Sequence, residues 1–209
     1  AVIVAPNNPT GKFVHDAIMA AAKQTATTGG IMLIDGAFAM PAAADPAAGD
    51  LLDALAAFPH VVHIRSFGKF FGMAGLRLGF AIGAAVHMDQ LQRCVGPWAV
   101  SSVALDIGNT ALNDTVWQAQ HSQFLRQQTE QLQMVLTRAN LKILGGTTLF
   151  QTIQTSRAKH LHDHLAKAAI WTRRFSQMPN LLRFGVPANA ADFARLSESL
   201  NNWRHKANQ

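Results

Sequence analysis

One lysine lies among aromatic residues and glycines, in the run Ser-Phe-Gly-Lys-Phe-Phe-Gly-Met-Ala-Gly-Leu-Arg-Leu-Gly at residues 66–79. An amine in apolar surroundings loses its proton more readily and becomes a nucleophile suited to Schiff-base chemistry. The glycines allow close approach of the backbone to a ligand, and the planar guanidinium of Arg77 suits a phosphate. The run therefore indicates Lys69 as a nucleophile beside a phosphate site, with an ordinary surface lysine as the alternative.

Two further polar signals each follow a short apolar run. Asn8 opens Asn-Pro-Thr-Gly after the apolar residues 1–5, and Asp35 opens Asp-Gly-Ala-Phe directly after residues 31–34. Taken singly, the first is a turn and the second a turn or a helix cap. Ligands of open α/β sheets bind outside the carboxyl ends of the strands. We therefore expect Asn8, Asp35 and Lys69 to lie at one edge of a sheet.

The elements that would position these residues alternate between strand and helix. The pattern predicts strands at 1–5, 31–34, 61–64 and 76–82, helices at 14–27 and 50–57, and a loop at 41–50. Such alternation predicts an α/β fold with a mostly parallel sheet covered by helices on both faces.

The second half of the chain has a different pattern of apolar and polar residues. Residues 101–139 are expected to be largely helical, followed by strands at 141–143, 149–154, 170–172 and 181–184 and helices at 158–168 and 190–204. We expect residues 1–100 to form part of a large domain, 101–140 a connecting long helix and 141–209 a small C-terminal α+β domain. The chain opens inside a strand without Met, so we also expect the upstream part of the large domain to be absent.

Composition excludes several classes of protein. Of 209 residues, 49% are hydrophobic and 14% charged, which is typical of a globular fold and not of a disordered chain. The formal net charge is +6, yet no run of Lys and Arg exceeds two residues, so an anionic small substrate is favoured over nucleic acid. No apolar run reaches the ~18 residues of a membrane span, and no signal peptide is visible. The single cysteine, Cys94, excludes an internal disulfide and is compatible with the cytoplasm.

The motifs together resemble those of a known family. Asn-Pro-x-Gly, Asp-x-Ala-aromatic and Ser-x-x-Lys occur in this order in the fold-type I pyridoxal 5′-phosphate (PLP) enzymes of the aspartate aminotransferase superfamily. The stretch 65–79 is similar to that of the histidinol-phosphate aminotransferase branch. Within it, residues 65–80, 96–101, 145–147, 173–175 and 182–185 most resemble the cobalamin-pathway threonine-phosphate decarboxylases. The resemblance covers the whole chain and about the last two-thirds of a family member.

The resemblance implies PLP as cofactor and a role for each matching residue. Lys69 would form the Schiff base with PLP and later move a proton. Asp35 would pair with the pyridine nitrogen and keep it protonated, so that the ring acts as an electron sink. Asn8 would hydrogen-bond the 3-oxygen of the ring. Ser66 and Arg77 would hold the cofactor phosphate.

Three further residues complete the expected site. Phe38 stands beside the cofactor position, where many relatives have a tyrosine; this chain has no tyrosine at all. Arg183 would clamp the substrate carboxylate with its planar guanidinium. Arg173 resembles a second arginine near the substrate's anionic end, for which Arg174 is the less favoured choice.

The implied reaction is decarboxylation of L-threonine O-3-phosphate to (R)-1-amino-2-propanol O-2-phosphate, for cobalamin biosynthesis, by a cytoplasmic homodimer. Two alternatives stay open: a histidinol-phosphate-type aminotransferase, and the PLP-binding effector domain of a transcription regulator. Decarboxylation and transamination can use the same lysine, aspartate and arginine. The upstream phosphate loop and ring-stacking residue of the family are missing from this chain, so we expect it to hold only part of the pocket.

Two other chemistries are less favoured. Ser66 and Lys69 match the Ser-x-x-Lys of penicillin-recognising enzymes, but the Ser-Asp-Asn and Lys-Thr-Gly that this signature needs do not occur. His160, His162 and His164 could hold a metal, but a solvated helix face is the better interpretation. We expect no metal site.

Overall fold

The computed structural model describes residues 1–41 and 46–207 and divides into two compact units. The first unit comprises Ala1–Asn8 and Lys12–His121. The second comprises Pro9–Gly11 and the chain from Ser122 onward. Each is described by itself.

The first unit is built on a four-stranded sheet. Its strands are β1 (Val2–Val4), β2 (Met32–Asp35), β3 (Val61–Ser66) and β4 (Gly79–Gly83), in the order β1-β2-β3-β4. The pairs β1–β2 and β2–β3 are parallel and β3–β4 is antiparallel. The predicted mostly parallel sheet is therefore confirmed. The fourth strand begins later than predicted, because Ala74–Leu76 forms a 3-10 turn and Arg77 adopts a left-handed φ of 55°.

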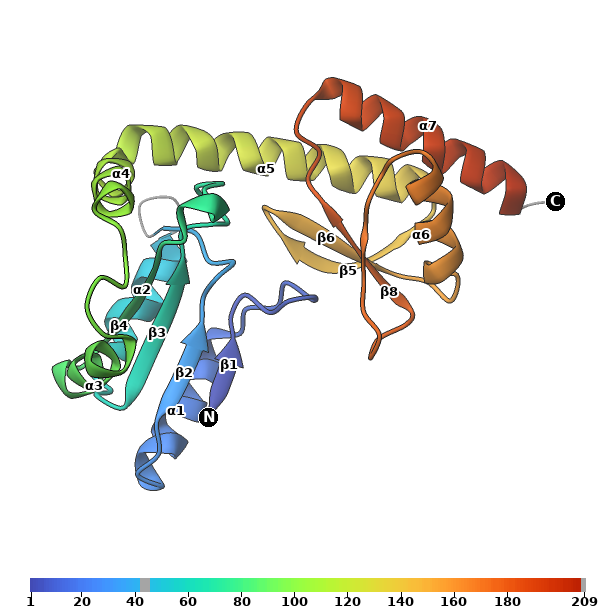
Figure 1. Ribbon diagram of the computed structural model, residues 1–209. Helices are drawn as coiled ribbons and strands as arrows, with labels where there is room; N and C mark the ends of the chain where they lie inside the picture. The colour runs from blue at the N-terminus through green and yellow to red at the C-terminus, as the bar shows by residue number, and fades with distance from the viewer. Residues whose placement is uncertain (42–45, 208–209) are drawn as a thin grey trace. The chain divides into compact units, whose positions relative to one another are not determined.

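Two helices cover one face of this sheet (Figure 1). They are α1 (His15–Thr27) and α2 (Pro46–Leu55). In α1, Ile18, Ala22 and Thr25 are buried at helical spacing, and the helix ends before Gly29, whose φ is 65°. The buried cluster beneath them comprises Ala5, Ile18, Ala22, Met32, Ile34, Leu51, Leu55 and Val61.

The predicted loop at 41–50 is wrong in its second part. Residues 42–45 lie outside the described residues, but Pro46 opens α2 and the helix continues through Asp50. Proline is tolerated in the first turn of a helix, because its missing N–H would have no helical partner there.

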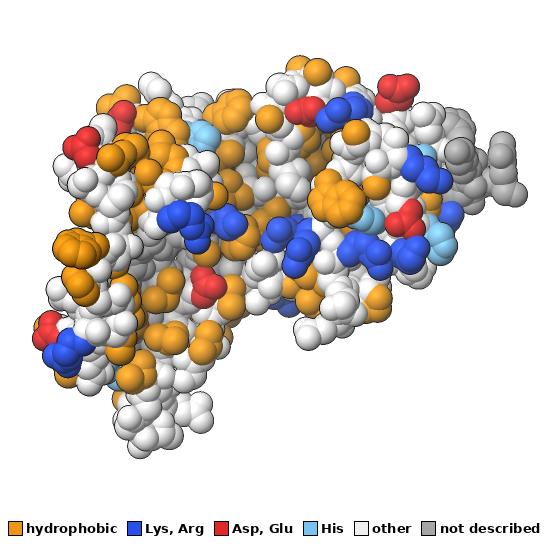
Figure 2. All heavy atoms as spheres, in the orientation of Figure 1, with side chains coloured by type: hydrophobic (Ala, Val, Ile, Leu, Met, Phe, Trp, Pro, Cys, Tyr) orange, Lys and Arg blue, Asp and Glu red, His pale blue; other side chains and the backbone are white. Residues whose placement is uncertain are grey.

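The opposite face of the sheet carries exposed apolar side chains. Val2 is 70% exposed, and Leu33 and Ile64 are each 38% exposed. Val2 pairs with Leu33 in the register, so the two side chains share this face. Figure 2 shows hydrophobic side chains gathered over the strands of this unit. Of the described helices, α3 (Ala85–Val95) also packs against this face at β4, where a Cβ at Gly83 would lie 3.3 Å from Met88 Cε.

Three helices follow the first sheet. They are α3 (Ala85–Val95), which the sequence analysis missed, α4 (Ser102–Asn113) and α5 (Thr115–Arg138). The single long helix expected at 101–139 is broken at Asp114, whose ψ of 73° is not helical. Asp114 Oδ1 instead accepts a hydrogen bond from Trp117 N at 2.9 Å and caps α5.

The second unit is α+β, as predicted. Its elements are β5 (Lys142–Thr147), β6 (Phe150–Gln154), α6 (Ala158–Lys167), β7 (Arg173–Arg174), β8 (Leu181–Gly185) and α7 (Ala190–Ala207). The sheet is antiparallel with the order β5-β6-β8-β7. Its core includes Leu132, Leu136, Ile153, Leu161, Leu165, Leu182, Leu196 and Leu200. Residues 170–172 are not a strand, and β7 begins immediately after them.

None of the helices in the described part of the chain has the length and apolar character needed to cross a membrane.

Candidate active site

Three of the residues singled out by sequence follow or end adjacent parallel strands. Asn8 follows β1, Asp35 ends β2 and Ser66 ends β3. Because these strands run parallel, their carboxyl ends meet at the same edge of the sheet. The edge expected from the sequence is therefore present in the first unit.

Asp35 is half-buried at the centre of this edge. Its Oδ1 accepts a hydrogen bond from Ala37 N at 2.9 Å, which orients the carboxylate. Within residues 1–41 and 46–207, its second oxygen, Oδ2, has no hydrogen-bond partner in the structure. One carboxylate oxygen is thus available to a cationic N–H donor.

Lys69 lies in the connection between β3 and β4. Its side chain is exposed, and Nζ lies 5.3 Å from the ring centroid of Phe38, within the range of a cation–π contact. Ser66 Oγ accepts a hydrogen bond from Gly68 N at 3.2 Å, so the start of the connection is fixed to the end of β3. A Cβ at Gly68 would lie 3.0 Å from Ala74 Cα, so the connection folds tightly back on itself.

Arg77 closes the same connection. Its Nη1 donates to the carbonyl of Ala74 at 3.2 Å, and its side chain is exposed. In the register, Ser66 pairs with Gly79, two residues after Arg77. Ser66, Lys69 and Arg77 therefore belong to one loop whose two ends are joined by the sheet.

Aromatic side chains fix the backbone that directly follows Lys69. Phe70 and Phe71 are buried, and the Phe71 ring is parallel to that of Trp117 with centroids 5.9 Å apart. Trp117 stacks on His121 at 4.6 Å, and His121 Nε2 donates to the carbonyl of Phe70 at 3.1 Å. Burial lowers the pKa of His121, while its hydrogen bond to Phe70 acts in the opposite direction. The residue next to Lys69 is thus anchored to α5.

The sequence analysis missed His121 and took Trp117 for an ordinary core or interface aromatic. An alternation of polar and apolar residues in α5 marks a buried face, but it does not indicate which loop that face meets. That information lies in tertiary packing.

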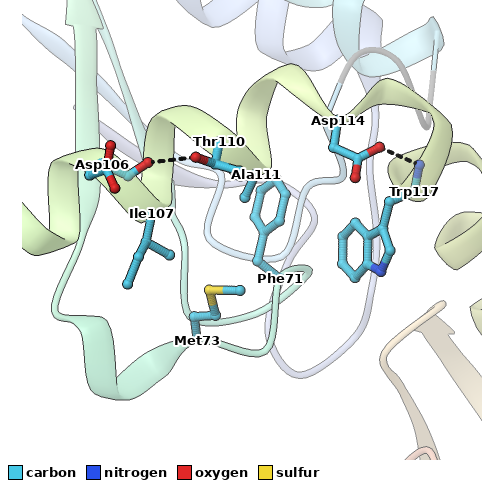
Figure 3. Close-up of a pocket in the computed structure, with 8 residues that line it drawn as sticks. All are labelled: Phe71, Met73, Asp106, Ile107, Thr110, Ala111, Asp114 and Trp117. Carbon is cyan, nitrogen blue, oxygen red and sulfur yellow. Dashed lines mark hydrogen bonds between the residues drawn. The ribbon is translucent and has the colours of Figure 1, made fainter.

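A cavity of about 300 Å³ lies against the same loop (Figure 3). Phe71 and Met73 line it from the loop, and Figure 3 shows α4 supplying Asp106, Ile107, Thr110 and Ala111. Asp114 and Trp117 complete the lining. None of the residues proposed to bind the cofactor lines this cavity, so we assign it no catalytic role.

The two arginines expected at the substrate lie together in the second unit. Arg173 in β7 pairs in register with Arg183 in β8. Arg183 is half-buried, with its guanidinium carbon 4.9 Å from the ring centroid of Phe150. Burial lowers the pKa of Arg183, and the positive charge of Arg173 lowers it further. Two adjacent positive charges therefore give this pair of strands a positive local potential.

Two of the three histidines of α6 make hydrogen-bonding contacts within the second unit. His162 is buried and its Nδ1 lies 2.8 Å from Thr172 Oγ1, while His164 Nε2 lies 2.9 Å from the carbonyl of Ser199. Among the described residues, no group of three His, Cys, Asp or Glu side chains is arranged to hold a metal ion.

Comparisons with known proteins agree with this architecture. The family model for aminotransferase class I and II matches residues 2–200. A threonine-phosphate decarboxylase of Pseudomonas aeruginosa is 37% identical over 209 residues, which is 100% of this chain and 61% of that protein. A histidinol-phosphate aminotransferase of Oleidesulfovibrio alaskensis is 34% identical over 152 residues, 72% of this chain and 39% of the relative.

A solved structure shows the same fold. The histidinol-phosphate aminotransferase of Sinorhizobium meliloti in complex with pyridoxal-5′-phosphate superposes with a TM-score of 0.81 at 20% identity. The match covers 99% of this chain and 57% of that one. The chain thus has an aspartate aminotransferase-like fold and spans about 60% of the length of the relative that matches all of it. It belongs to the class I and II aminotransferase family of PLP-dependent enzymes.

Proposed function

We propose that this chain belongs to a PLP-dependent decarboxylase that acts on L-threonine O-3-phosphate. The observation that carries the proposal is the 37% identity to a threonine-phosphate decarboxylase along the whole chain. The paired arginines of the second unit agree with it, because the substrate carries a carboxylate and a phosphate in addition to its amine.

The residues at the sheet edge fit PLP chemically. The available Oδ2 of Asp35 suits the N–H of a protonated pyridine, and Lys69 supplies the amine for covalent attachment. We propose that Asn8 binds the 3-oxygen, that Phe38 packs beside the ring and that Ser66 and Arg77 hold the phosphate. The hydroxyl of Ser66 accepts from Gly68 N, so its own proton remains able to donate to a phosphate oxygen.

Bound PLP supplies a conjugated ring that can accept the electron pair released when a bond to the substrate α-carbon breaks. In the proposed reaction the bond between the α-carbon and the carboxylate carbon breaks, and carbon dioxide leaves. Lys69 Nζ, released from the cofactor when the substrate amine takes its place, would then deliver a proton to the α-carbon. Asp35 would keep the pyridine nitrogen protonated, and Arg183 would orient the carboxylate before it is lost.

The runner-up is a histidinol-phosphate-type aminotransferase, which the second relative favours. Histidinol phosphate has no carboxylate, so Arg183 would then bind glutamate or its keto acid. In either case we propose that the protein is a cytoplasmic homodimer and that its substrate is a small phosphorylated amine or amino acid.

A paired incubation separates these two reactions. The complete gene product is given L-threonine O-3-phosphate in one reaction, and histidinol phosphate with 2-oxoglutarate in another. We expect carbon dioxide from the first and no glutamate from the second. Glutamate without carbon dioxide would replace the decarboxylase by the aminotransferase and leave the cofactor assignments in place. PLP binding without either product would favour the third possibility, an effector domain.

A further inference from the structure

The turn that carries Asn8 is divided between the two units. Asn8 belongs to the first unit, whereas the next three residues, Pro9–Gly11, belong to the second. Pro9 is buried, and its carbonyl accepts a hydrogen bond from Thr152 Oγ1 at 2.5 Å. Thr152 in β6 is itself 0% exposed. The residue next to Asn8 is thus held by a fully buried side chain of the second unit.

Backbone packing at glycines reinforces this attachment. Gly11 has a φ of 70°, and a Cβ there would overlap the carbonyl oxygen of Gly146. A Cβ at Gly145 would overlap the carbonyl oxygen of Thr10. Gly145 and Gly11 are therefore required where residues 10 and 11 lie directly against β5, whereas a Cβ at Gly146 would instead overlap the carbonyl oxygen of Phe150.

The same threonine is next to the proposed substrate arginine. Thr152 in β6 pairs in register with Arg183 in β8, and Arg183 pairs with Arg173 in β7. Direct partners in a sheet project side chains to the same face about 4.5–5.5 Å apart. Thr152 is therefore both the register partner of Arg183 and the hydrogen-bond donor to Pro9.

We propose that Thr152 is a positioning residue for Asn8: its hydroxyl fixes the Pro9 carbonyl and thereby sets the orientation in which the Asn8 amide meets the cofactor ring. This inference rests on the proposed PLP site. It also gives Gly145 a role, because that glycine permits the close approach of Thr10 that accompanies the bond to Pro9.

The mechanism predicts a spectroscopic effect. The Asn8 amide would donate to the 3-oxygen of PLP and so favour the ionised form of that oxygen. Loss of this hydrogen bond should move the pH midpoint of the cofactor's visible absorbance transition upward. The shift should be about one pH unit or more, as expected for one hydrogen bond to a charged oxygen.

The test compares Thr152→Val with two matched variants in the complete gene product. Thr152→Ser keeps the hydroxyl. Thr129→Val removes a similar bond in the same unit, from Thr129 Oγ1 to the carbonyl of Thr148 at 2.9 Å, away from Pro9. We expect Asn8→Ala and Thr152→Val to shift the absorbance midpoint upward, with no further shift in the double variant. Thr152→Ser and Thr129→Val should retain the wild-type midpoint, even where Thr129→Val lowers the melting temperature.

A midpoint for Thr152→Val equal to that of Thr129→Val, or a further full shift when it is added to Asn8→Ala, would overturn the role of Thr152. A wild-type protein without visible absorbance in the presence of PLP would instead refute the cofactor site. Hydrogen exchange of the apo-protein gives a second readout. Residues 7–12 should exchange faster in Thr152→Val than in Thr129→Val, and equal rates would contradict the attachment through Pro9.

Discussion

Asp35 is the residue that we propose pairs with the pyridine nitrogen of PLP. Its Oδ1 is oriented by one backbone hydrogen bond, and the remaining oxygen is available within the described chain. The position of this carboxylate could be predicted from sequence, because an Asp directly after a buried parallel strand lies at the carboxyl edge. The aromatic anchoring of the Lys69 loop by Trp117 and His121 could not, because it depends on packing between segments about 50 residues apart.

At this scale we predict that Asp35→Ala retains some PLP but loses most turnover, because an unprotonated pyridine is a poor electron sink. Loss of the charge-assisted hydrogen bond should weaken cofactor binding by ~1.5–3 kcal/mol. Equilibrium titration with PLP and steady-state assays measure the two effects. The exposed Asp53 in α2 provides a control, since Asp53→Ala should alter neither. Turnover near wild type in Asp35→Ala would refute this role.

Arg183 allows a second prediction about a single residue. Arg183→Ala should raise KM for L-threonine O-3-phosphate by roughly 10- to 100-fold, the effect of one lost charge-assisted contact of about 1.5–3 kcal/mol. Arg174→Ala, on the neighbouring strand, is the matched control and should have a much smaller effect. An equal rise in KM for both variants would indicate general attraction by the basic surface rather than a clamp.

At the scale of elements, the strands were easier to predict than the helix boundaries. The short apolar runs at 1–5, 31–34 and 61–64 predicted β1, β2 and β3 to within about two residues. The long helix expected at 101–139 is interrupted at Asp114, whose side chain caps the next helix. Helix α3 was not predicted, although Met88, Leu91 and Val95 follow helical spacing, because an apolar stripe of only three residues is a weak signal between a glycine-rich strand and Gly96-Pro97.

The β3 strand carries a histidine that should make stability depend on pH. Burial lowers the pKa of His63 from its ordinary value of 6.5, and the charge of Arg65 lowers it further. The unfolded chain therefore binds a proton at a higher pH than the folded chain does. Stability should decrease as pH falls below about 6.5 and stop changing, for this group, below the folded-state pKa.

Chemical denaturation at several pH values measures this dependence. We expect His63→Val to reduce the loss of stability between pH 7 and pH 5 relative to wild type, whereas His15→Ala, at an exposed position, should leave the slope unchanged. An unchanged slope in His63→Val would mean that other groups cause the pH dependence.

At the scale of the whole molecule, the exposed apolar face of the first sheet favours association between copies of the chain. Val2, Leu33 and Ile64 lie on it, and contiguous apolar surface promotes association. We predict that the 209-residue chain expressed alone aggregates or dimerises and binds a hydrophobic dye strongly. Replacement of the three residues by Thr should reduce both effects in light scattering and dye fluorescence. A monodisperse monomer with a PLP spectrum like that of the complete gene product would contradict this prediction.

The most direct test of the central claim is to locate the covalent bond to the cofactor. The complete gene product is saturated with PLP, reduced with borohydride, digested and mapped by mass spectrometry. We predict that the pyridoxyl label is found on the peptide containing Lys69 and is lost in Lys69→Ala. Label on Lys12 or Lys23 in place of Lys69 would contradict the assignment of the active site.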